Sequence, residues 1–195
     1  MRIIAGKFRH RILVDSSKFK DLRPTTDSNR EALFNILANG NIAKEVNFSL
    51  LNASVLDLCC GTGAVGIEAL SRGAKDVTFI DNNQQHLLLA KKNAEQLLIL
   101  NNCQFIQCDV LKLPTAQKKF ELIFIDPPYN FNYWLIIKEL ENKGYFSEGI
   151  LIVVEHQNFS DSKNKNFKDQ DYQKFNLNFL GQKKYGKTIF DFFSR

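Results

Sequence analysis

The sequence predicts an α/β fold, in which a doubly wound sheet carries helices on both faces and an antiparallel hairpin closes the sheet. Two observations support this prediction. Along most of the chain, short apolar runs that fit buried strands alternate with segments of helical periodicity. Near the carboxyl end, residues 174–180 and 188–193 instead alternate apolar and polar side chains, which is typical of an antiparallel pair.

The composition fits one such domain. The chain has 195 residues, of which 44% are hydrophobic, and its formal net charge is +5. Its 4 cysteines have neither metal-ligand spacing nor the pattern of a secreted disulfide framework. The adjacent Cys59 and Cys60 are expected to point opposite ways on a strand. We therefore expect reduced core thiols, no metal, and a cytoplasmic location.

The chain is not expected to enter a membrane. Its first residues are charged where a signal peptide would be apolar. No apolar stretch in the sequence approaches the length that spans a bilayer.

The first 25 residues are expected to form a basic arm ahead of a main domain that spans residues 26–195. Residues 1–11 fit two short strands around a turn at Gly6, and they form the most basic segment of the chain. Arg9 and Arg11 are candidate contacts to RNA phosphates. The alternative is a charged edge that protects a terminal hairpin from aggregation.

A helix is predicted after this arm. Ser28 and Glu31 have capping-box spacing, and the helix should run to about Leu37. Its core face is predicted to hold Leu33, Phe34, Ile36 and Leu37. Arg23 and Arg30 flank the helix start, whose free N–H groups form an anion site. We interpret these arginines as ligand or nucleic-acid contacts; the alternative is cap chemistry alone.

Residues 54–59 fit a buried strand that runs into a glycine turn and a helix. Gly61, Gly63 and Gly66 satisfy the dinucleotide-binding pattern, which alone is a weak signal. Asp57 precedes the turn, where an acid suits a positively charged ligand better than a pyrophosphate. This arrangement favours a sulfonium cofactor with an amino group over a nicotinamide cofactor.

Acids also follow the next strands, so the series is Asp57, Asp81, Asp109 and Asp126. Asp81 comes about twenty residues after the glycine turn, where an acceptor for ribose hydroxyls is expected. Asp109 is placed to accept the adenine amine of a cofactor. Because the carboxyl ends of parallel strands meet at one edge of a sheet, the series predicts a ligand site there.

The remaining elements complete the sheet. Strands are predicted at 77–80, 103–108 and 149–154, and helices at 84–100 and 133–142. Core candidates on the helix at 84–100 are Leu88, Ala94, Leu97 and Leu98. Glu155 ends the last of these strands, and the polar residues 157–170 are expected to form a loop.

The sequence Asp-Pro-Pro-Tyr at 126–129 follows the apolar run at 122–125. The prolines end the strand and leave Asp126 at its carboxyl end. The Asp126 carboxylate and the Pro127 carbonyl can accept the two N–H groups of an exocyclic base amine, while Tyr129, held beyond Pro128, can stack on the base. These residues are the candidate catalytic set. The alternative is a strand-end turn with a chance acid.

Several segments resemble the RsmD family of small-subunit ribosomal RNA guanine-N2 methyltransferases. They are Arg-Ile-Ile-Ala-Gly at 2–6, Leu-Arg-Pro-Thr-Thr-Asp at 22–27, Arg-Glu-Ala-Leu-Phe-Asn at 30–35, the glycine turn at 57–66 with Glu-Ala-Leu-Ser-Arg-Gly at 68–73, Asp-Pro-Pro-Tyr at 126–129, and Tyr-Gly-Lys-Thr at 185–188. Two departures from the family pattern are Cys59-Cys60, where Phe-Ala is often seen, and Tyr129, where Phe is frequent.

The resemblance implies a class I methyltransferase fold, with S-adenosylmethionine as cofactor and the exocyclic N2 amine of a guanine in 16S ribosomal RNA as methyl acceptor. Cofactor contacts are then expected from Asp57, Gly61, Gly63, Asp81 and Asp109. RNA contacts are expected from Arg9, Arg11, Arg23 and Lys187. The expected partner is the small ribosomal subunit or its assembly intermediate, and the enzyme is expected to act as a monomer.

Two other classes remain open from the residues alone. A DNA adenine-N6 methyltransferase would use the same four residues, although the chain lacks room for a large target-recognition domain. A non-catalytic nucleic-acid binder with this fold would also share the glycines and the acids. Methyl transfer to ribosomal RNA, compared with transfer to duplex DNA, separates these classes.

Overall fold

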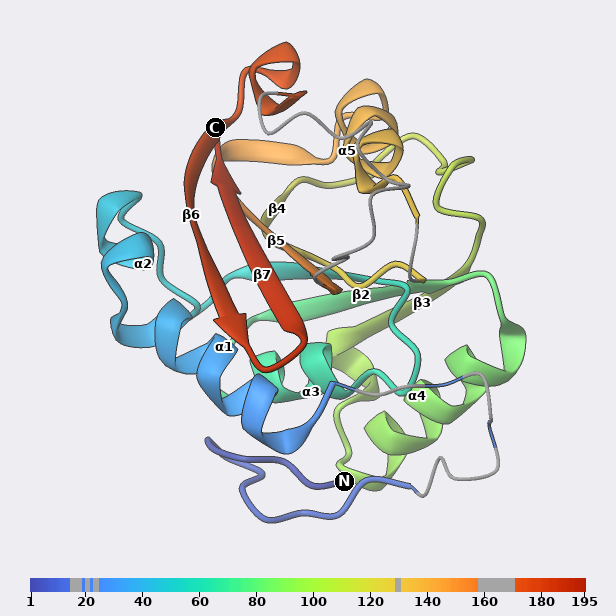
Figure 1. Ribbon diagram of the computed structural model, residues 1–195. Coiled ribbons are helices and arrows are strands. Elements are labelled where there is room, and N and C mark those ends of the chain that lie inside the picture. Colours follow the sequence, from blue (N-terminus) through green and yellow to red (C-terminus); the bar gives the residue numbers. More distant parts are fainter. Residues whose placement is uncertain (15–18, 20–21, 23–24, 129–130, 158–170) are drawn as a thin grey trace.

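The structure is a computed structural model that describes the chain except for residues 15–18, 20–21, 23–24, 129–130 and 158–170 (Figure 1). Two of the candidate site residues, Arg23 and Tyr129, lie outside the described residues. The polar segment predicted as a loop also lies outside them, apart from Gln157.

A seven-stranded sheet forms the centre of the molecule, with the strand order β3-β2-β1-β4-β5-β7-β6. The strands are β1 Ser54–Leu58, β2 Asp76–Asp81, β3 Cys103–Gln107, β4 Phe120–Ile125, β5 Phe146–Gln157, β6 Asn178–Tyr185 and β7 Thr188–Ser194. β1 to β5 pair in parallel, whereas β7 is antiparallel to both β5 and β6. The predicted doubly wound sheet with a closing hairpin is confirmed.

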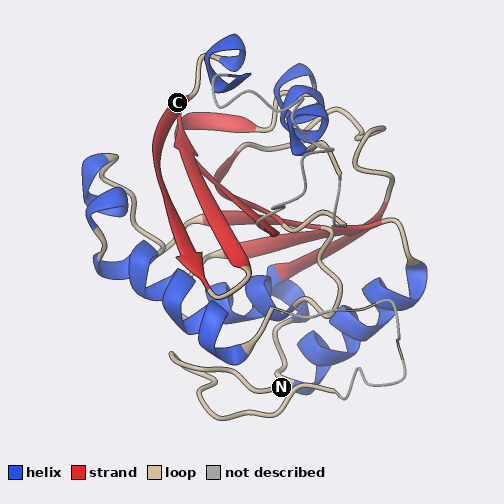
Figure 2. Cartoon of the chain, in the orientation of Figure 1, coloured by secondary structure: helices blue, strands red, loops and turns tan. Residues whose placement is uncertain are grey.

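Helices cover both faces of the sheet (Figures 1 and 2). They are α1 Asp27–Asn39, α2 Asn41–Glu45, α3 Ala64–Ser71, α4 Gln84–Gln96 and α5 Tyr133–Asn142, with short 3-10 turns η1 Leu100–Asn102 and η3 Asp171–Phe175. α1, α3 and α4 pack on one face, and α5 packs on the other. Within the described part of the chain, no helix has the length and apolar character needed to cross a membrane.

Strands β1 and β4 are buried on both faces because their apolar residues alternate between two cores. In β4, Leu122 and Phe124 face the core under α1, α3 and α4. Ile123 and Ile125 face the core under α5. The near-continuous apolar runs of the sequence are thus the expected signature of central parallel strands.

The N-terminal arm, residues 1–14, packs on α3. The backbone N–H groups of Ile4 and Ala5 donate to the buried Glu68 carboxylate at 2.8 and 3.0 Å. Ile3 is buried in the core at the same place. The two predicted strands are not formed, because Arg2 and Ile12 make only an isolated antiparallel bridge. The two limbs share a few backbone hydrogen bonds, such as Ile3 N–H to the Arg11 carbonyl oxygen at 3.0 Å, while the segment between them folds as turns that bond to α3.

The start of α1 is built around Arg30, whose exposed fraction is only 1%. Its guanidinium donates to the carbonyl oxygen of Thr25 at 3.0 Å and to the Asp27 carboxylate at 2.9 Å. It also donates to the carbonyl oxygen of Arg2, so it joins the arm to the helix. Arg30 is therefore a buried structural residue, and its interpretation as a ligand or nucleic-acid contact is wrong.

Three details of the predicted helices are also wrong. The α1 cap is Thr26, whose hydroxyl accepts from the Asn29 N–H at 3.2 Å, so Ser28 lies inside the helix. Helix α4 ends at Gln96, because Leu98 takes a positive φ of 58°. Leu98 is 92% exposed and Leu88 is 50% exposed, so neither belongs to the core.

Strand boundaries shift as well. β5 begins at Phe146, ahead of the predicted start at Gly149, because a register irregularity near Phe120 extends its pairing with β4. β6 begins at Asn178 and continues to Tyr185, so the residues predicted to join the hairpin mostly belong to the strand. Cys59 is a turn residue with φ of 57°, and not the strand residue that was expected.

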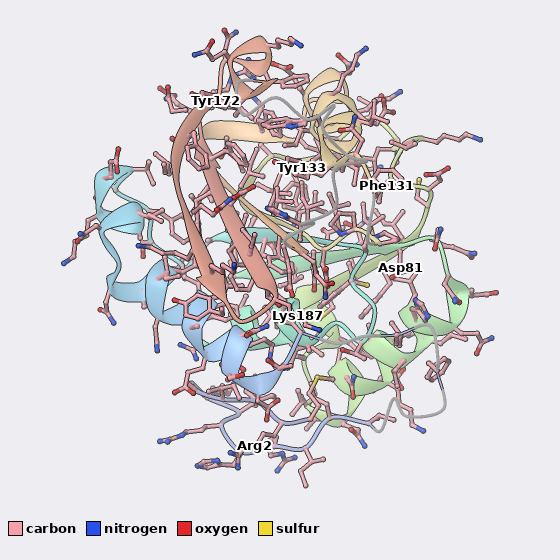
Figure 3. The ribbon with its side chains drawn as sticks, in the orientation of Figure 1. Arg2, Asp81, Phe131, Tyr133, Tyr172 and Lys187 are labelled. Carbon is pink, nitrogen blue, oxygen red and sulfur yellow. The ribbon has the colours of Figure 1, made fainter. Side chains whose placement is uncertain are left out.

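A cluster of polar side chains links β7 to β5 on the sheet face that α5 covers. The Asp191 carboxylate lies 2.8 Å from His156 Nε2 and accepts from Gln182 Nε2 at 2.6 Å and from the Tyr133 hydroxyl at 3.3 Å. Tyr133, which opens α5, is labelled in Figure 3. Although burial opposes protonation of His156, the Asp191 carboxylate and the Gln157 carbonyl raise its pKa.

Candidate functional site

A cavity of about 490 Å³ opens at the carboxyl ends of the parallel strands. All four acids predicted from the strand ends line it, namely Asp57, Asp81, Asp109 and Asp126. The glycine turn between β1 and α3 forms another part of its wall. Its volume suits a small molecule of the size of a nucleoside cofactor. Among the residues that the structure describes, no cluster of His, Cys, Asp and Glu is arranged to hold a metal ion.

The turn requires its glycines for two reasons. Gly63, which caps α3, has a φ of 72°, in the left-handed region that disfavours other residues. A Cβ atom at Gly66 would lie 2.5 Å from Cε1 of Phe79 in β2. Close packing of α3 on the sheet thus depends on Gly66, and the open shape of the turn depends on Gly63.

Asp57 joins the strand to the helix that follows. It lies one residue before the end of β1, and its Oδ2 accepts from the Gly66 N–H at 2.9 Å. Burial raises the pKa of this carboxyl to about 8, although the hydrogen bond from Gly66 opposes the shift and the Asp81 charge adds to it. One carboxylate oxygen of Asp57 therefore has a structural role, because it accepts a hydrogen bond from α3.

Asp81 ends β2 and organises the neighbouring turns. Its Oδ2 accepts from the Gly61 N–H at 2.9 Å, and its Oδ1 accepts from the Asn83 N–H at 2.9 Å. His86 Nδ1 lies 3.3 Å from Oδ1. Figure 3 labels Asp81. A carboxylate has about four lone-pair positions, so Asp81 can still accept a hydrogen bond from a hydroxyl group.

Asp109 is the exposed member of the set. It follows β3, and its Oδ1 accepts from the Leu111 N–H at 2.9 Å. This bond orders the turn after the strand and leaves the other carboxylate oxygen available at the rim of the cavity.

Asp126 follows β4, and its backbone N–H donates to the Leu58 carbonyl oxygen at 3.3 Å, which continues the pairing with β1. Among the described residues, no donor bonds to its carboxylate. Burial and the charges of Glu155 and Asp57 raise the pKa of Asp126 well above its usual range. Pro127 and Pro128 line the cavity beside it, as does Phe131.

Two further site residues, Thr25 and Glu155, were not selected from the sequence as site residues. The Thr25 hydroxyl donates to Glu155 Oε2 at 2.9 Å, and Thr25 lines the cavity. Burial raises the pKa of Glu155 to about 7, although the hydrogen bond from Thr25 opposes the shift. The one available signal was that β5, like its neighbours, ends in an acid; nothing local to Thr25 pairs it with a residue 130 positions away.

The basic residues do not share one location. Thr188 pairs with Gln157 at the carboxyl end of β5, so Lys187 lies on the side of the sheet where the parallel strands end. Arg9 follows the tip of the arm, where the Lys7 N–H donates to the carbonyl oxygen of Ser71 at the far end of α3. Arg9 therefore lies on the other side of α3 from the cavity, and not beside Lys187. Arg9 and Arg11 are both exposed, and their contact with RNA stays a prediction.

Comparison with known proteins identifies the family. The family described as Conserved hypothetical protein 95 matches residues 1–194. Ribosomal RNA small subunit methyltransferase D from Escherichia coli strain K12 is 36% identical over 163 residues, which cover 80% of this chain and 75% of the relative. The chain belongs to this family, the RsmD family.

Solved structures agree with the fold of the RsmD family. The Escherichia coli protein yhhF superposes with a TM-score of 0.77 at 28% identity, covering 100% of this chain and 97% of that chain. An S-adenosylmethionine-dependent methyltransferase from Clostridium acetobutylicum has a TM-score of 0.59 at 15% identity, covering 87% of this chain and 99% of that one. The fold is thus the class I Rossmann-like methyltransferase fold.

The raised pKa of Asp57 predicts how stability depends on pH. A carboxyl whose pKa rises from 3.8 to about 8 on folding holds its proton more tightly in the folded state. Its contribution to stability is full below the unfolded value and is lost as the pH rises through the folded value. We expect the free energy of unfolding to fall between pH 5 and pH 8, in denaturant titrations at each pH.

Asp57→Asn should flatten this dependence, by at most about 1.4 kcal/mol per pH unit, which is the limit for one proton. Glu155 shifts in the same direction, so a residual slope should persist. The exposed Glu148 is the matched control, and Glu148→Gln should leave the slope unchanged. A parental slope in Asp57→Asn would contradict the assignment.

Proposed function

We propose that this chain binds S-adenosylmethionine in the cavity and transfers its methyl group to the exocyclic N2 amine of a guanine in 16S ribosomal RNA. The observation that carries the proposal is the meeting of four acids and a glycine turn in one cavity, with Asp126 at its wall. Membership of the RsmD family supports the reaction class. The Escherichia coli relative is named a ribosomal RNA small subunit methyltransferase, which supports the substrate.

The donor set of the cavity fits this cofactor. Asp57, Asp81 and Asp126 lie near one another, because the Asp81 charge raises the pKa of Asp57 and the Asp57 charge raises the pKa of Asp126. A cavity of this kind favours a cation, and S-adenosylmethionine carries two positive groups, the sulfonium and the amino group. Asp81 retains acceptor capacity for the ribose hydroxyls, and Asp109 retains it for the adenine amine. When bound, the cofactor supplies an electrophilic methyl group.

Asp126 and the Pro127 carbonyl then act on the base amine. The amine lone pair is delocalised into the ring, which makes the amine a poor nucleophile. Two acceptors on its N–H groups favour a more tetrahedral nitrogen and aim its lone pair at the methyl group. The ionised Asp126 carboxylate takes up a proton once the nitrogen becomes cationic. Tyr129, outside the described residues, is proposed to stack on the splayed base.

Mapping of methylated nucleotides tests the proposed function. Small ribosomal subunits from cells that lack this protein are incubated with it and with radiolabelled S-adenosylmethionine, and the labelled nucleoside is identified. N2-methylguanosine at one 16S position is the expected product. Naked 16S ribosomal RNA and duplex DNA are parallel substrates. Label in adenine of the duplex alone would instead favour a DNA methyltransferase, and the absence of label everywhere would favour a non-catalytic binder.

Asp81→Ala should weaken binding of S-adenosylmethionine by about 1.5–3 kcal/mol, the range for a hydrogen bond to a charged group. Titration calorimetry measures the effect. Glu148→Ala, at an exposed acid in the early part of β5, is the control that should keep parental affinity. Unchanged affinity for S-adenosylmethionine in a folded Asp81→Ala protein would show that Asp81 does not bind the cofactor.

Asp126→Asn keeps the shape of the side chain but replaces one acceptor with a donor that faces the amine. A loss of at least ~100-fold in single-turnover methyl transfer is expected, since a positioned proton acceptor is removed. Cofactor affinity should change little, and Glu148→Gln is the matched acid-to-amide control. Near-parental turnover in Asp126→Asn would reduce Asp126 to a turn residue.

Lys187→Ala should lower the slope of log affinity for 16S ribosomal RNA against log salt concentration by roughly 0.7–0.9, the value for one lost phosphate contact. Arg9, Arg11 and Arg23 are proposed as further contacts of the same kind. Lys75, exposed at the opposite edge of the sheet before β2, is the control, and Lys75→Ala should keep the parental slope. If both lysine variants behave alike, Lys187 is ordinary solvated surface.

A further inference from the structure

Thr25 and Asp126 lie on one wall of the cavity. β4 and β5 are parallel neighbours in which Ile125 pairs with Val154, so Asp126 and Glu155 follow at the same level. By the alternation of side chains along β4 and β5, Asp126 and Glu155 lie on the sheet face that packs under α1, α3 and α4. Glu155 is buried, Thr25 bonds to it, and both Thr25 and Asp126 reach the cavity. Glu155 is thus a common neighbour of the two residues, because the Thr25 hydroxyl donates to it and its charge acts on Asp126.

The hydrogen bond to Glu155 fixes the polarity of the Thr25 hydroxyl. A hydroxyl has one donor and two acceptor positions, and when Glu155 is ionised the single proton of Thr25 points to Glu155 Oε2. Only lone pairs remain for the cavity side. The backbone at Thr25 is held as well, because the buried Arg30 donates to its carbonyl oxygen at 3.0 Å. The cavity wall therefore presents two adjacent acceptors, the Asp126 carboxylate and Thr25 Oγ1.

Two adjacent acceptors require a base with two adjacent donors. In guanine, the N2 amine adjoins the ring N1–H, so both groups donate. In adenine and cytosine, each ring nitrogen next to the exocyclic amine, N1 of adenine or N3 of cytosine, is an acceptor. An acceptor placed opposite Thr25 Oγ1 would leave two buried lone pairs facing each other, which is costly.

We propose that Thr25, oriented by Glu155, accepts the N1–H of the target guanine and thereby makes the site selective for guanine over adenine. This inference rests on the proposed function, because it places the guanine amine at Asp126. It also gives the Arg30 network a role in recognition: the network holds Thr25 in place, and Glu155 sets the direction of its proton.

The test compares guanine with 2-aminopurine, which keeps the N2 amine but has an acceptor at N1. Each base is built into 16S ribosomal RNA at the mapped position, and the RNA is reconstituted into small subunits. Single-turnover rates are measured for the parental protein, Thr25→Val and Thr25→Ser. Serine keeps the hydroxyl, whereas valine has the same shape without it. 2-Aminopurine also lacks O6, which could change the rate by itself. The evidence for Thr25 is therefore the difference between variants in the ratio of the guanine rate to the 2-aminopurine rate.

The parental protein and Thr25→Ser should prefer guanine by roughly 10- to 100-fold, in line with one hydrogen bond to a fixed partner. Thr25→Val should reduce this preference at least fivefold, chiefly through a slower rate on guanine, while cofactor affinity stays parental. If Thr25→Val does not fold, Thr25→Ala is used in its place and the same reduction is expected.

A parental rate ratio near one would overturn the inference, and so would a Thr25→Val or Thr25→Ala protein that keeps the parental preference. In both cases guanine is still methylated, so the proposed function survives. A parental protein that binds S-adenosylmethionine but methylates no guanine would overturn the proposed function and this inference together.

Discussion

Parallel pairing of β2, β1, β4 and β5 is the constraint on which the cavity depends. Parallel strands end at one edge of the sheet, so acids far apart in the sequence become neighbours there. The same pairing sets Asp126 level with Glu155. Burial at this edge raises the pKa values of Asp57 and Glu155, so these two carboxyls hold protons more tightly than they would in solution. A positively charged ligand would favour the ionised forms of these acids, so the cavity suits a cation.

Arg30 connects the N-terminal segments at 2–6, 22–27 and 30–35 with one another. This residue has no exposed charge to offer a partner; it bonds to Arg2, Thr25 and Asp27 at the point where the arm meets α1. Thr25 in turn bonds to Glu155 beside the β4 end. One buried guanidinium therefore connects the start of the chain with the wall of the cavity, through contacts that span 130 residues of sequence.

The sheet and the acids could be predicted because each depends on local patterns: apolar runs, turn glycines and an acid at each strand end. The position of Leu98 could not, because a single left-handed residue ends α4 and turns that side chain outward. The burial of Arg30 and the pairing of Thr25 with Glu155 could not be predicted from the sequence either, since both depend on tertiary neighbours. Thr26 and Ser28 are equally good caps by type, and only the path of the chain into α1 decides between them.

The N-terminal arm is held on α3 by partners that are distant in sequence. The carboxylate that accepts from the backbone N–H groups of Ile4 and Ala5 belongs to Glu68, which is 64 and 63 residues further along the chain. Until α3 has formed, the arm has no surface on which to settle. Glu68 is itself buried and bonds to Arg72 at 2.7 Å, so the arm closes over an ion pair behind the glycine turn. Loss of the Glu68 carboxylate would therefore deprive both the arm and Arg72 of a shared partner.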